Sequence, residues 1–145
     1  MKLLFVCTGN ICRSPLAEGI APLIAKQFHL VVEAKSAGTL GLSNIAADPH
    51  SVAVCKEVGV DISKHLSQGL SEELINWADY ILVMERRHAE KVRGQFPQSL
   101  DKVLELGSFG SMSAIPDPIG GWKFKFRRTR KQITKCLEGF FKNFR

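Results

Sequence analysis

One short segment near the N-terminus holds a thiol and a guanidinium with five residues between them. It reads Val6-Cys7-Thr8-Gly9-Asn10-Ile11-Cys12-Arg13-Ser14-Pro15. A loop that leads from a strand into a helix N-terminus gathers backbone N–H groups around an anion. A cysteine in such a loop is favoured as its reactive thiolate. The segment therefore predicts a site that binds a phosphate-like dianion and attacks it with Cys7.

The residues on either side predict that this segment is such a loop. Lys2–Cys7 is an apolar run typical of a strand that is buried on both faces of a parallel sheet. Beyond the loop, apolar residues recur at helical spacing, namely Leu16, Ile20, Leu23, Ile24 and Phe28. Ser14 is expected to cap this helix, and Pro15 suits its first turn.

The residue types match the needs of phosphoryl transfer: bound equatorial oxygens, a nucleophile in line, and a proton for the leaving group. Arg13 offers a planar fork for two oxygens. Ser14 could donate its hydroxyl to the Cys7 sulfur, and Gly9 and Asn10 tolerate the left-handed backbone of a tight cradle. The alternative is a buried structural cysteine in a strand-to-helix turn. A Walker loop is excluded because no Gly-Lys-Ser/Thr follows Gly9.

Strands alternate with helices along the rest of the chain. Further strands are expected at Val31–Ser36, Asp79–Met84 and Lys102–Leu106, and helices at Pro49–Val58, Ser71–Trp77, Arg86–Phe96 and Phe124–Phe144. This order predicts right-handed crossovers and a four-stranded parallel sheet covered by helices, a Rossmann-like three-layer α/β sandwich. We expect one domain, residues 1–145. Ligands bind such sheets at the carboxyl ends of the strands, where the loop after the first strand lies.

Composition limits the function classes. Hydrophobic residues make up 45% and charged residues 23% of the chain, as in soluble globular proteins. No stretch is long enough to span a membrane and no cleavable leader is recognisable, so we expect a cytoplasmic protein. The four cysteines lack the spacing of a zinc site or a disulfide framework, which predicts reduced thiols.

The positive charge of the chain lies at its C-terminal end. Residues 122–145 hold nine Lys or Arg and one acidic residue, whereas the whole chain has a net charge of +6. Apolar residues there follow a helical stripe, namely Phe126, Ile133, Leu137, Phe140, Phe141 and Phe144. We expect this helix to pack on the sheet with its cations in solvent. The alternative is a patch that binds an anionic surface or an acidic partner. Its members would be Lys123, Lys125, Arg127, Arg128, Arg130 and Lys131.

The stretch V-C-T-G-N-I-C-R-S-P-L-A-E resembles the phosphate loop of the low-molecular-weight protein tyrosine phosphatases almost residue for residue. Other landmarks follow in the family's order, and the resemblance covers essentially the whole chain. They are Ser36-Ala37-Gly38-Thr39, Gly59-Val60-Asp61-Ile62-Ser63-Lys64-His65, Ala78-Asp79-Tyr80-Ile81-Leu82-Val83-Met84 and Ile115-Pro116-Asp117-Pro118.

The resemblance implies a mechanism without metal or organic cofactor. Cys7 looks like the nucleophile that forms a phosphocysteine intermediate, and Arg13 like the clamp on the transition state. Asp117 matches the general acid that protonates the leaving oxygen and then activates water. The phosphate-binding residues would be Thr8, Gly9, Asn10, Ile11, Cys12 and Ser14, with His65 supporting the loop. The implied partner is a phosphorylated protein and not a nucleic acid, and the chain is expected to be a monomer or weak dimer.

Two of these residues also have plainer interpretations. Asp117 could belong to an ordinary Asp-Pro turn. However, Pro116 and Pro118 keep it extended, and Gly120 and Gly121 leave the loop room to move, which suits a mobile acid. Cys12 could be a small apolar filler. In the family, a second loop cysteine can form a reversible disulfide with the nucleophile, which would protect Cys7 from over-oxidation.

The pocket walls depart from the family pattern. Many members have aromatic residues where Leu42 and Ile119 stand here, and these stack on a phosphotyrosine ring. Asp117-Pro118-Ile119-Gly120-Gly121 resembles the related protein arginine phosphatases, but that branch carries Thr in place of Ile11. We therefore expect phosphotyrosine or small aryl phosphates as substrates, with phosphoarginine as the alternative.

Two other functions are disfavoured. A related arsenate reductase needs further cysteines on a loop near residues 85–93, and that segment has none. A phosphoprotein-binding module without turnover would have no need of Cys7, Arg13 and Asp117 together.

Overall fold

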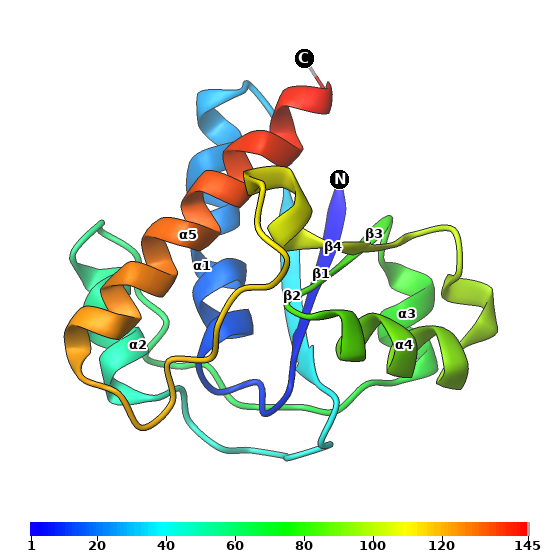
Figure 1. Ribbon diagram of the computed structural model, residues 1–145, viewed down its shortest axis with the longest axis horizontal. Coiled ribbons are helices and arrows are strands. Elements are labelled where there is room, and N and C mark those ends of the chain that lie inside the picture. The colour runs from blue at the N-terminus through cyan, green and yellow to red at the C-terminus, as the bar shows by residue number, and fades with distance from the viewer. Residues whose placement is uncertain (145) are drawn as a thin grey trace.

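The computed structural model describes residues 1–144, which form a sheet with helices on both faces (Figure 1). The strands are β1 (Lys2–Cys7), β2 (Glu33–Gly38), β3 (Tyr80–Val83) and β4 (Val103–Glu105). The α-helices are α1 (Arg13–Gln27), α2 (Pro49–Lys56), α3 (Glu72–Trp77), α4 (Arg86–Gln95) and α5 (Lys123–Phe141). Short 3-10 turns are η1 (Pro97–Ser99), η2 (Leu106–Gly110) and η3 (Lys142–Phe144). No helix in the described part of the chain is long and apolar enough to cross a membrane.

The sheet is parallel throughout, with the strand order β2-β1-β3-β4. Side chains of the inner strand β1 alternate between two cores. Leu3, Phe5 and Cys7 pack in the core that contains α1 and α5. Leu4 and Val6 enter the core formed with α3 and α4. The apolar side chains of β1 therefore pack in the cores on both faces of the sheet. The expected three-layer sandwich is confirmed.

Helix α5 closes one face of the sheet. Its apolar stripe is fully buried, namely Phe126, Ile133, Cys136, Leu137, Phe140 and Phe141. Phe140 meets Tyr80 and Phe109 edge to face, with ring centroids 5.6 and 5.2 Å apart, a favourable arrangement for aromatic quadrupoles. The expectation that this helix packs on the sheet is confirmed.

Part of the basic segment is neutralised within the fold. Glu57, just after α2, accepts hydrogen bonds from Arg127 Nε at 2.8 Å and Arg130 Nη1 at 2.7 Å. Lys123 Nζ lies 3.8 Å from the same carboxylate. Hydrogen bonds from Arg127 and Arg130 lower the pKa of Glu57 to about 2. These three cations therefore tie α5 to α2.

Most element boundaries lie within two residues of expectation, and α5 ends at Phe141 rather than Phe144. Two of the differences bear on the packing and the site. Strand β2 begins at Glu33 because β1 begins at its partner Lys2, which leaves Val31 without a ladder position and 87% exposed. Helix α1 begins at Arg13, so Ser14 lies inside its first turn and does not cap it. The Ser14 hydroxyl is consequently available to the loop.

Candidate active site

The loop of residues 8–12 lies at the carboxyl end of β1 and packs against the end of β2. A Cβ on Gly38, the last residue of β2, would stand 2.7 Å from the Thr8 carbonyl oxygen and 2.9 Å from the Gly9 carbonyl carbon. The N–H of Leu40 donates to that Thr8 oxygen over 3.0 Å. A larger residue at Gly38 would displace the loop, so glycine is required here for close approach.

Asn10 shapes the loop from inside. Its backbone φ is 59°, in the left-handed region, and its side chain is fully buried. The amide donates to Ser14 Oγ at 2.7 Å and Ser36 Oγ at 2.9 Å, and Oδ1 accepts the N–H of Gln68 at 3.0 Å. His65 Nε2 donates to the Asn10 carbonyl oxygen at 2.8 Å. The structure thus brings Asn10, Ser14 and His65 together.

Two donors point at the Cys7 sulfur. The Asn10 N–H donates to Sγ over 3.3 Å, and Ser14 Oγ lies 2.9 Å from it. Because the Asn10 side chain already donates to Ser14 Oγ, the hydroxyl proton of Ser14 is directed to the sulfur. Donors of this kind stabilise a thiolate relative to a thiol. With 3% of its surface exposed, Cys7 forms the floor of the site.

Arg13 is 1% exposed, and acceptors from two distant segments hold it in place. Its Nη1 donates to Glu85 Oε2 at 2.6 Å and to the Ile115 carbonyl oxygen at 2.8 Å. Its Nη2 lies 3.7 Å from Asp117 Oδ2. The guanidinium fork is therefore oriented in the free protein.

Glu85 follows β3 and holds a second guanidinium. Its Oε1 and Oε2 accept hydrogen bonds from Arg87 Nε at 3.2 Å and Nη2 at 3.1 Å. Burial acts to raise the pKa of Glu85, but the hydrogen bonds from Arg87 and Arg13 outweigh it and lower that pKa to about 2. The carboxylate therefore stays ionised from neutral to mildly acidic pH.

His88 reaches the loop from α4. Its Nδ1 accepts the backbone N–H of Glu85 at 3.1 Å, so the ring proton sits on Nε2, which lies 2.9 Å from Thr8 Oγ1. Burial of the ring, and then the charge of Arg13, lower the pKa of His88 to about 4. The imidazole is therefore neutral at pH 7 and donates to Thr8.

Cys7, Arg13 and Asp117 line one narrow pocket of about 30 Å³. The same pocket is lined by Gly9, Ile11, Cys12 and Ile119. Asp117 is 34% exposed, and its Oδ1 accepts the N–H of Ile119 at 3.1 Å. The thiol and the carboxyl group therefore face a common space, with the arginine between them in the wall.

Ile11 and Leu42 lie together over Gly9. Their Cδ1 atoms stand 3.6 and 3.9 Å from the position that a Cβ on Gly9 would take. Ile11 lines the narrow pocket directly, whereas Leu42 is not among its lining residues. Ile119 also lines the pocket and is 61% exposed. The apolar side chains that line the narrow pocket are therefore Ile11 and Ile119.

Cys12 is the second thiol of the pocket and is 5% exposed. Burial, reinforced by the carboxylate of Asp48, raises the pKa of Cys12 to about 12. Cys12 is therefore a neutral thiol, and both it and Cys7 are free of any disulfide. Within this pocket only the sulfur of Cys7 has the donors that suit a nucleophile.

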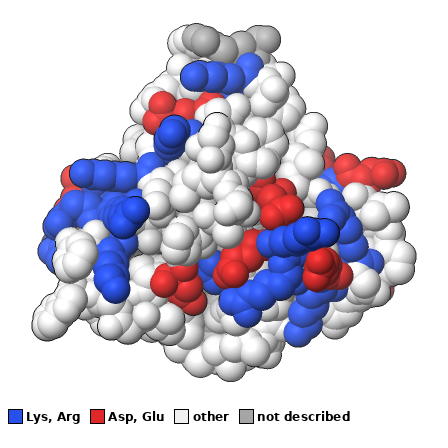
Figure 2. All heavy atoms as spheres, viewed as in Figure 1, with Lys and Arg blue, Asp and Glu red and all other residues white. Residues whose placement is uncertain are grey.

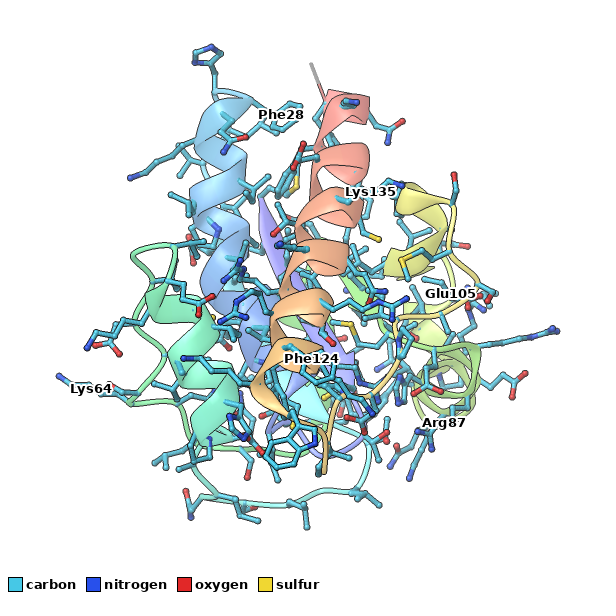
Figure 3. The ribbon with its side chains drawn as sticks, turned by 60° about the vertical axis from the view of Figure 1, so that its left-hand side comes forward. Phe28, Lys64, Arg87, Glu105, Phe124 and Lys135 are labelled. Atoms are coloured by element: carbon cyan, nitrogen blue, oxygen red, sulfur yellow. The ribbon has the colours of Figure 1, made fainter. Side chains whose placement is uncertain are left out.

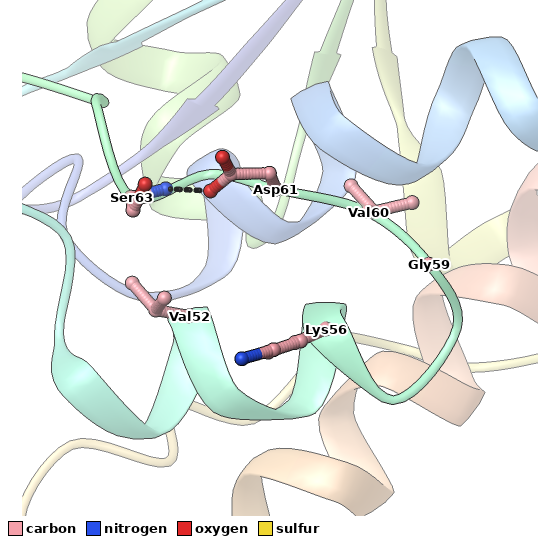
Figure 4. A pocket seen from close by; sticks show the side chains of 6 residues that line it. All are labelled: Val52, Lys56, Gly59, Val60, Asp61 and Ser63. Carbon is pink, nitrogen blue, oxygen red and sulfur yellow. Dashed lines mark hydrogen bonds between the residues drawn. The ribbon is translucent and has the colours of Figure 1, made fainter.

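A larger hollow of about 450 Å³ lies away from these residues, between α2 and the segment that follows it (Figure 4). It is lined by Val52, Lys56, Gly59, Val60, Asp61 and Ser63. Asp61 accepts the backbone N–H of Ser63 at 2.8 Å across its rim. The hollow contains none of the loop residues and no cysteine, so size alone does not locate the reactive site.

Comparison with known proteins identifies the family. The family model described as "Low molecular weight phosphotyrosine protein phosphatase" matches residues 2–145 of this chain. The chain belongs to this family. A protein-arginine-phosphatase of Bacillus subtilis is 37% identical over 139 residues, covering 94% of this chain and 92% of that protein. The low molecular weight protein-tyrosine-phosphatase Ptp of Acinetobacter johnsonii is 33% identical over 142 residues, covering 98% and 96% of the two chains.

The fold agrees with solved structures of the low molecular weight phosphatases. The crystal structure of the low molecular weight protein tyrosine phosphatase from T. tengcongensis matches with a TM-score of 0.92 and 34% sequence identity, covering 99% of each chain. Both the family and the sandwich expected from the sequence are confirmed. Membership in the low molecular weight phosphatase family makes this chain a cysteine-dependent hydrolase.

Three side chains of the site were not expected from the sequence, namely Glu85, Arg87 and His88. One signal could have found Glu85: it follows the strongest strand pattern of the chain and so lies at the carboxyl edge of the parallel sheet, next to the loop. His88 and Arg87 follow on the first turn of α4, where no motif marks them.

We expect Glu85→Gln to lower both the stability and the activity of the protein. We also expect it to make the stability less dependent on pH. Loss of the charged partner of buried Arg13 should lower the free energy of unfolding at pH 7 by about 1–3 kcal/mol. It should also reduce kcat roughly tenfold through misplacement of the clamp. Because folding lowers the Glu85 pKa from 4.5 to about 2, its stabilising contribution is complete above 4.5 and disappears as the pH falls to 2.

Urea unfolding at pH 7 and pH 3 measures this effect. The stability difference between the two pH values should be smaller in Glu85→Gln than in the wild type. The matched control is Glu90→Gln, because the Glu90 ion pair with Arg86 is exposed and should contribute little. Equal acid dependence in all three proteins would show that the Glu85 carboxylate does not stabilise the clamp.

Proposed function

We propose that this protein hydrolyses phosphotyrosine and related aryl phosphate monoesters of protein substrates through a phosphocysteine intermediate. One observation carries the proposal: Cys7, buried Arg13 and Asp117 line the same narrow pocket. A nucleophile, a fixed cationic clamp and a proton donor are the three requirements of this reaction. Release of p-nitrophenol from p-nitrophenyl phosphate at mildly acidic pH, with EDTA present, tests it.

In the first step the Cys7 thiolate attacks phosphorus and the bond from phosphorus to the aryl oxygen breaks. Arg13 and the N–H groups of the loop hold the equatorial oxygens, where charge is present throughout the transfer. Asp117, in its protonated form, gives its proton to the leaving oxygen. The products are a phosphocysteine, the free phenol and an Asp117 carboxylate.

In the second step water attacks the phosphocysteine. The Asp117 carboxylate takes a proton from that water, the sulfur–phosphorus bond breaks, and inorganic phosphate leaves. The donors from Ser14 and Asn10 stabilise the departing thiolate. A reducing compartment, which we propose to be the cytoplasm, would keep Cys7 in the form that this cycle requires.

The apolar pocket wall supports an aromatic substrate. Ile11 and Ile119 present only aliphatic groups beside the narrow pocket. An aryl ring loses no hydrogen bonds between such walls. A phosphorylated guanidinium would find the Asp117 carboxylate as an acceptor but no acceptor on the Ile11 and Ile119 side chains, so its other N–H groups would lose hydrogen bonds with water.

Phosphoarginine is a second candidate because of the segment Asp117-Pro118-Ile119-Gly120-Gly121. The protein-arginine-phosphatase of Bacillus subtilis is also among the proteins to which this chain is similar, at 37% identity. What separates the two substrates physically is whether the wall at Ile11 can accept a hydrogen bond. This makes Ile11 the residue to change.

We expect Ile11→Thr to shift preference toward phosphoarginine. A hydroxyl at this position could accept an N–H of the substrate, and kcat/KM for a phosphoarginine peptide should rise roughly tenfold relative to a phosphotyrosine peptide. The control is Val31→Thr, which also replaces an aliphatic group by a hydroxyl, at a position that is 87% exposed and outside the pocket. If the wild type already turns over phosphoarginine faster than phosphotyrosine, the second candidate is the correct function.

We further propose that Cys12 protects Cys7 from irreversible oxidation. Peroxide would convert Cys7 to a sulfenic acid, and the Cys12 thiol would then displace water to form a disulfide that dithiothreitol reduces. After a peroxide pulse, wild-type activity should return on reduction. Cys12→Ser should recover only a small fraction of its starting activity, with a sulfinic or sulfonic acid at Cys7 by mass spectrometry. Equal recovery in both proteins would contradict this role.

A further inference from the structure

A further hollow, distinct from the two described above, is also lined by Asp117. It has a volume of about 340 Å³ and runs between the loop that carries Asp117 and the first turns of α5. We call it the α5 groove; it is lined by Asp117 and Pro118 from the loop and by Phe124, Lys125, Arg128 and Gln132 from α5. Because Asp117 also lines the narrow pocket above Cys7, the two spaces adjoin at this residue.

The α5 groove presents free cations beside an exposed ring. Lys125 and Arg128 are exposed, and neither side chain has a hydrogen bond or ion pair with any residue of the described range 1–144. Phe124, labelled on the first turns of α5 in Figure 3, is 59% exposed. The carboxylate of Asp117 is directed to Arg13 and the Ile119 N–H. The positive charge of the groove is therefore unneutralised.

Other cations around the site are already paired. On the neighbouring face of α5, Arg127 and Arg130 bind Glu57. On α4, Arg87 binds Glu85 and Arg86 binds Glu90. Figure 2 shows these basic groups as two separate areas, over α5 on the left and over α4 on the right, with acidic side chains between them. Free positive charge adjoining the pocket thus lies in the α5 groove.

We propose that the α5 groove binds an acidic segment of the protein substrate, next to its phosphorylated residue. This inference rests on the proposed function. The narrow pocket, of about 30 Å³, is too small to take more than the phosphorylated end of one side chain, so the neighbouring residues of the substrate must lie outside it, and the α5 groove adjoins it at Asp117. Carboxylates there would meet Lys125 and Arg128, and an apolar side chain would cover Phe124. The enzyme would then select phosphorylated sites by the acidic residues that flank them.

The test compares two phosphotyrosine peptides that differ only in whether the four residues after the phosphotyrosine are Glu or Gln. For the wild type, kcat/KM should favour the Glu peptide, and in Lys125→Gln/Arg128→Gln that preference should fall about three- to tenfold, as expected for two exposed charge contacts. The wild-type preference should also shrink at high ionic strength. Turnover of p-nitrophenyl phosphate, which has no flanking residues, should be unchanged.

Lys135→Gln/Lys142→Gln is the matched control, since it removes the same charge from α5 and the 3-10 turn η3 that follows it, outside the groove. It should keep the preference. Equal turnover of both peptides by the wild type, or equal loss of preference in the control, would overturn the inference. Binding of phosphatidylserine vesicles that is lost in Lys125→Gln/Arg128→Gln, without a peptide preference, would also overturn it and assign the groove to a membrane.

Failure of the proposed function gives a different pattern. In that case neither p-nitrophenyl phosphate nor either peptide is hydrolysed by the wild type. Fluorescence anisotropy of the two peptides on Cys7→Ser then decides the inference without turnover. Tighter binding of the Glu peptide that requires Lys125 and Arg128 supports the α5 groove, and equal binding of the two peptides contradicts it.

Discussion

Cys7→Ser is expected to reduce the hydrolysis of p-nitrophenyl phosphate by about 10⁴-fold or more, the loss seen when a covalent nucleophile is removed. A serine hydroxyl needs a general base, and Asp117 cannot be that base in the first step because it must supply a proton to the leaving oxygen there. His65 donates to the Asn10 carbonyl oxygen, and His88 donates to Thr8 with its other nitrogen already engaged. The two donors at the sulfur position do not suffice to ionise a serine hydroxyl, which is a far weaker acid than a thiol.

Folding must be shown to be intact for this result to count. Inorganic phosphate should still raise the melting temperature of Cys7→Ser, because the backbone cradle and Arg13 do not depend on the sulfur. Turnover above about a tenth of the wild-type value would contradict a phosphocysteine mechanism, because removal of a covalent nucleophile reduces the rate far more than that.

Asp117→Asn is expected to slow turnover by about 10²–10⁴-fold for a substrate with a poor leaving group such as a phosphotyrosine peptide. The amide cannot give a proton to the leaving oxygen or take one from water. The loss should be smaller for p-nitrophenyl phosphate in the first step, because p-nitrophenolate leaves without protonation. Rapid-quench measurement of the phosphoenzyme separates the two steps.

The Asp117→Asn variant should also retain bound phosphopeptide, because Cys7 and Arg13 remain in place. Asp101→Asn makes the same change at an exposed residue outside the pocket and should keep wild-type rates. Equal losses for both leaving groups in both steps would indicate that Asp117 acts through Arg13, 3.7 Å away, and not as the proton donor.

Much of the fold follows from local patterns. The apolar run of β1 and the helical spacing after it predict strand, loop and helix within one or two residues, because burial and periodicity are properties of neighbouring residues. The start of β2 is predicted less well. The first paired residue of β2 depends on where β1 begins, because Lys2 pairs with Glu33. This pairing cannot be predicted from the residues of either segment alone.

The reactive residues of the loop could be predicted from the sequence, but the distant residues that hold them in place could not. Cys7 and Arg13 lie six positions apart in the sequence, and both belong to the loop motif. Glu85 comes from another strand, and its hydrogen bond to Arg13 joins residues 72 positions apart. The same holds for Lys125 and Arg128: the sequence shows a basic helix, but only the fold separates the cations that Glu57 neutralises from those beside Asp117.

The anchoring of Ile115 has a consequence for the catalytic cycle. Its N–H donates to the Met84 carbonyl oxygen at 3.0 Å, and its own carbonyl oxygen accepts from Arg13 at 2.8 Å. The segment that carries Asp117 is therefore fastened to the sheet and to the clamp two residues before the acid. A lid that closes over each substrate molecule loses conformational entropy every time it closes. At Ile115 that ordering occurs once, when the chain folds, so each new substrate meets an acid-bearing segment that is already fixed on its N-terminal side.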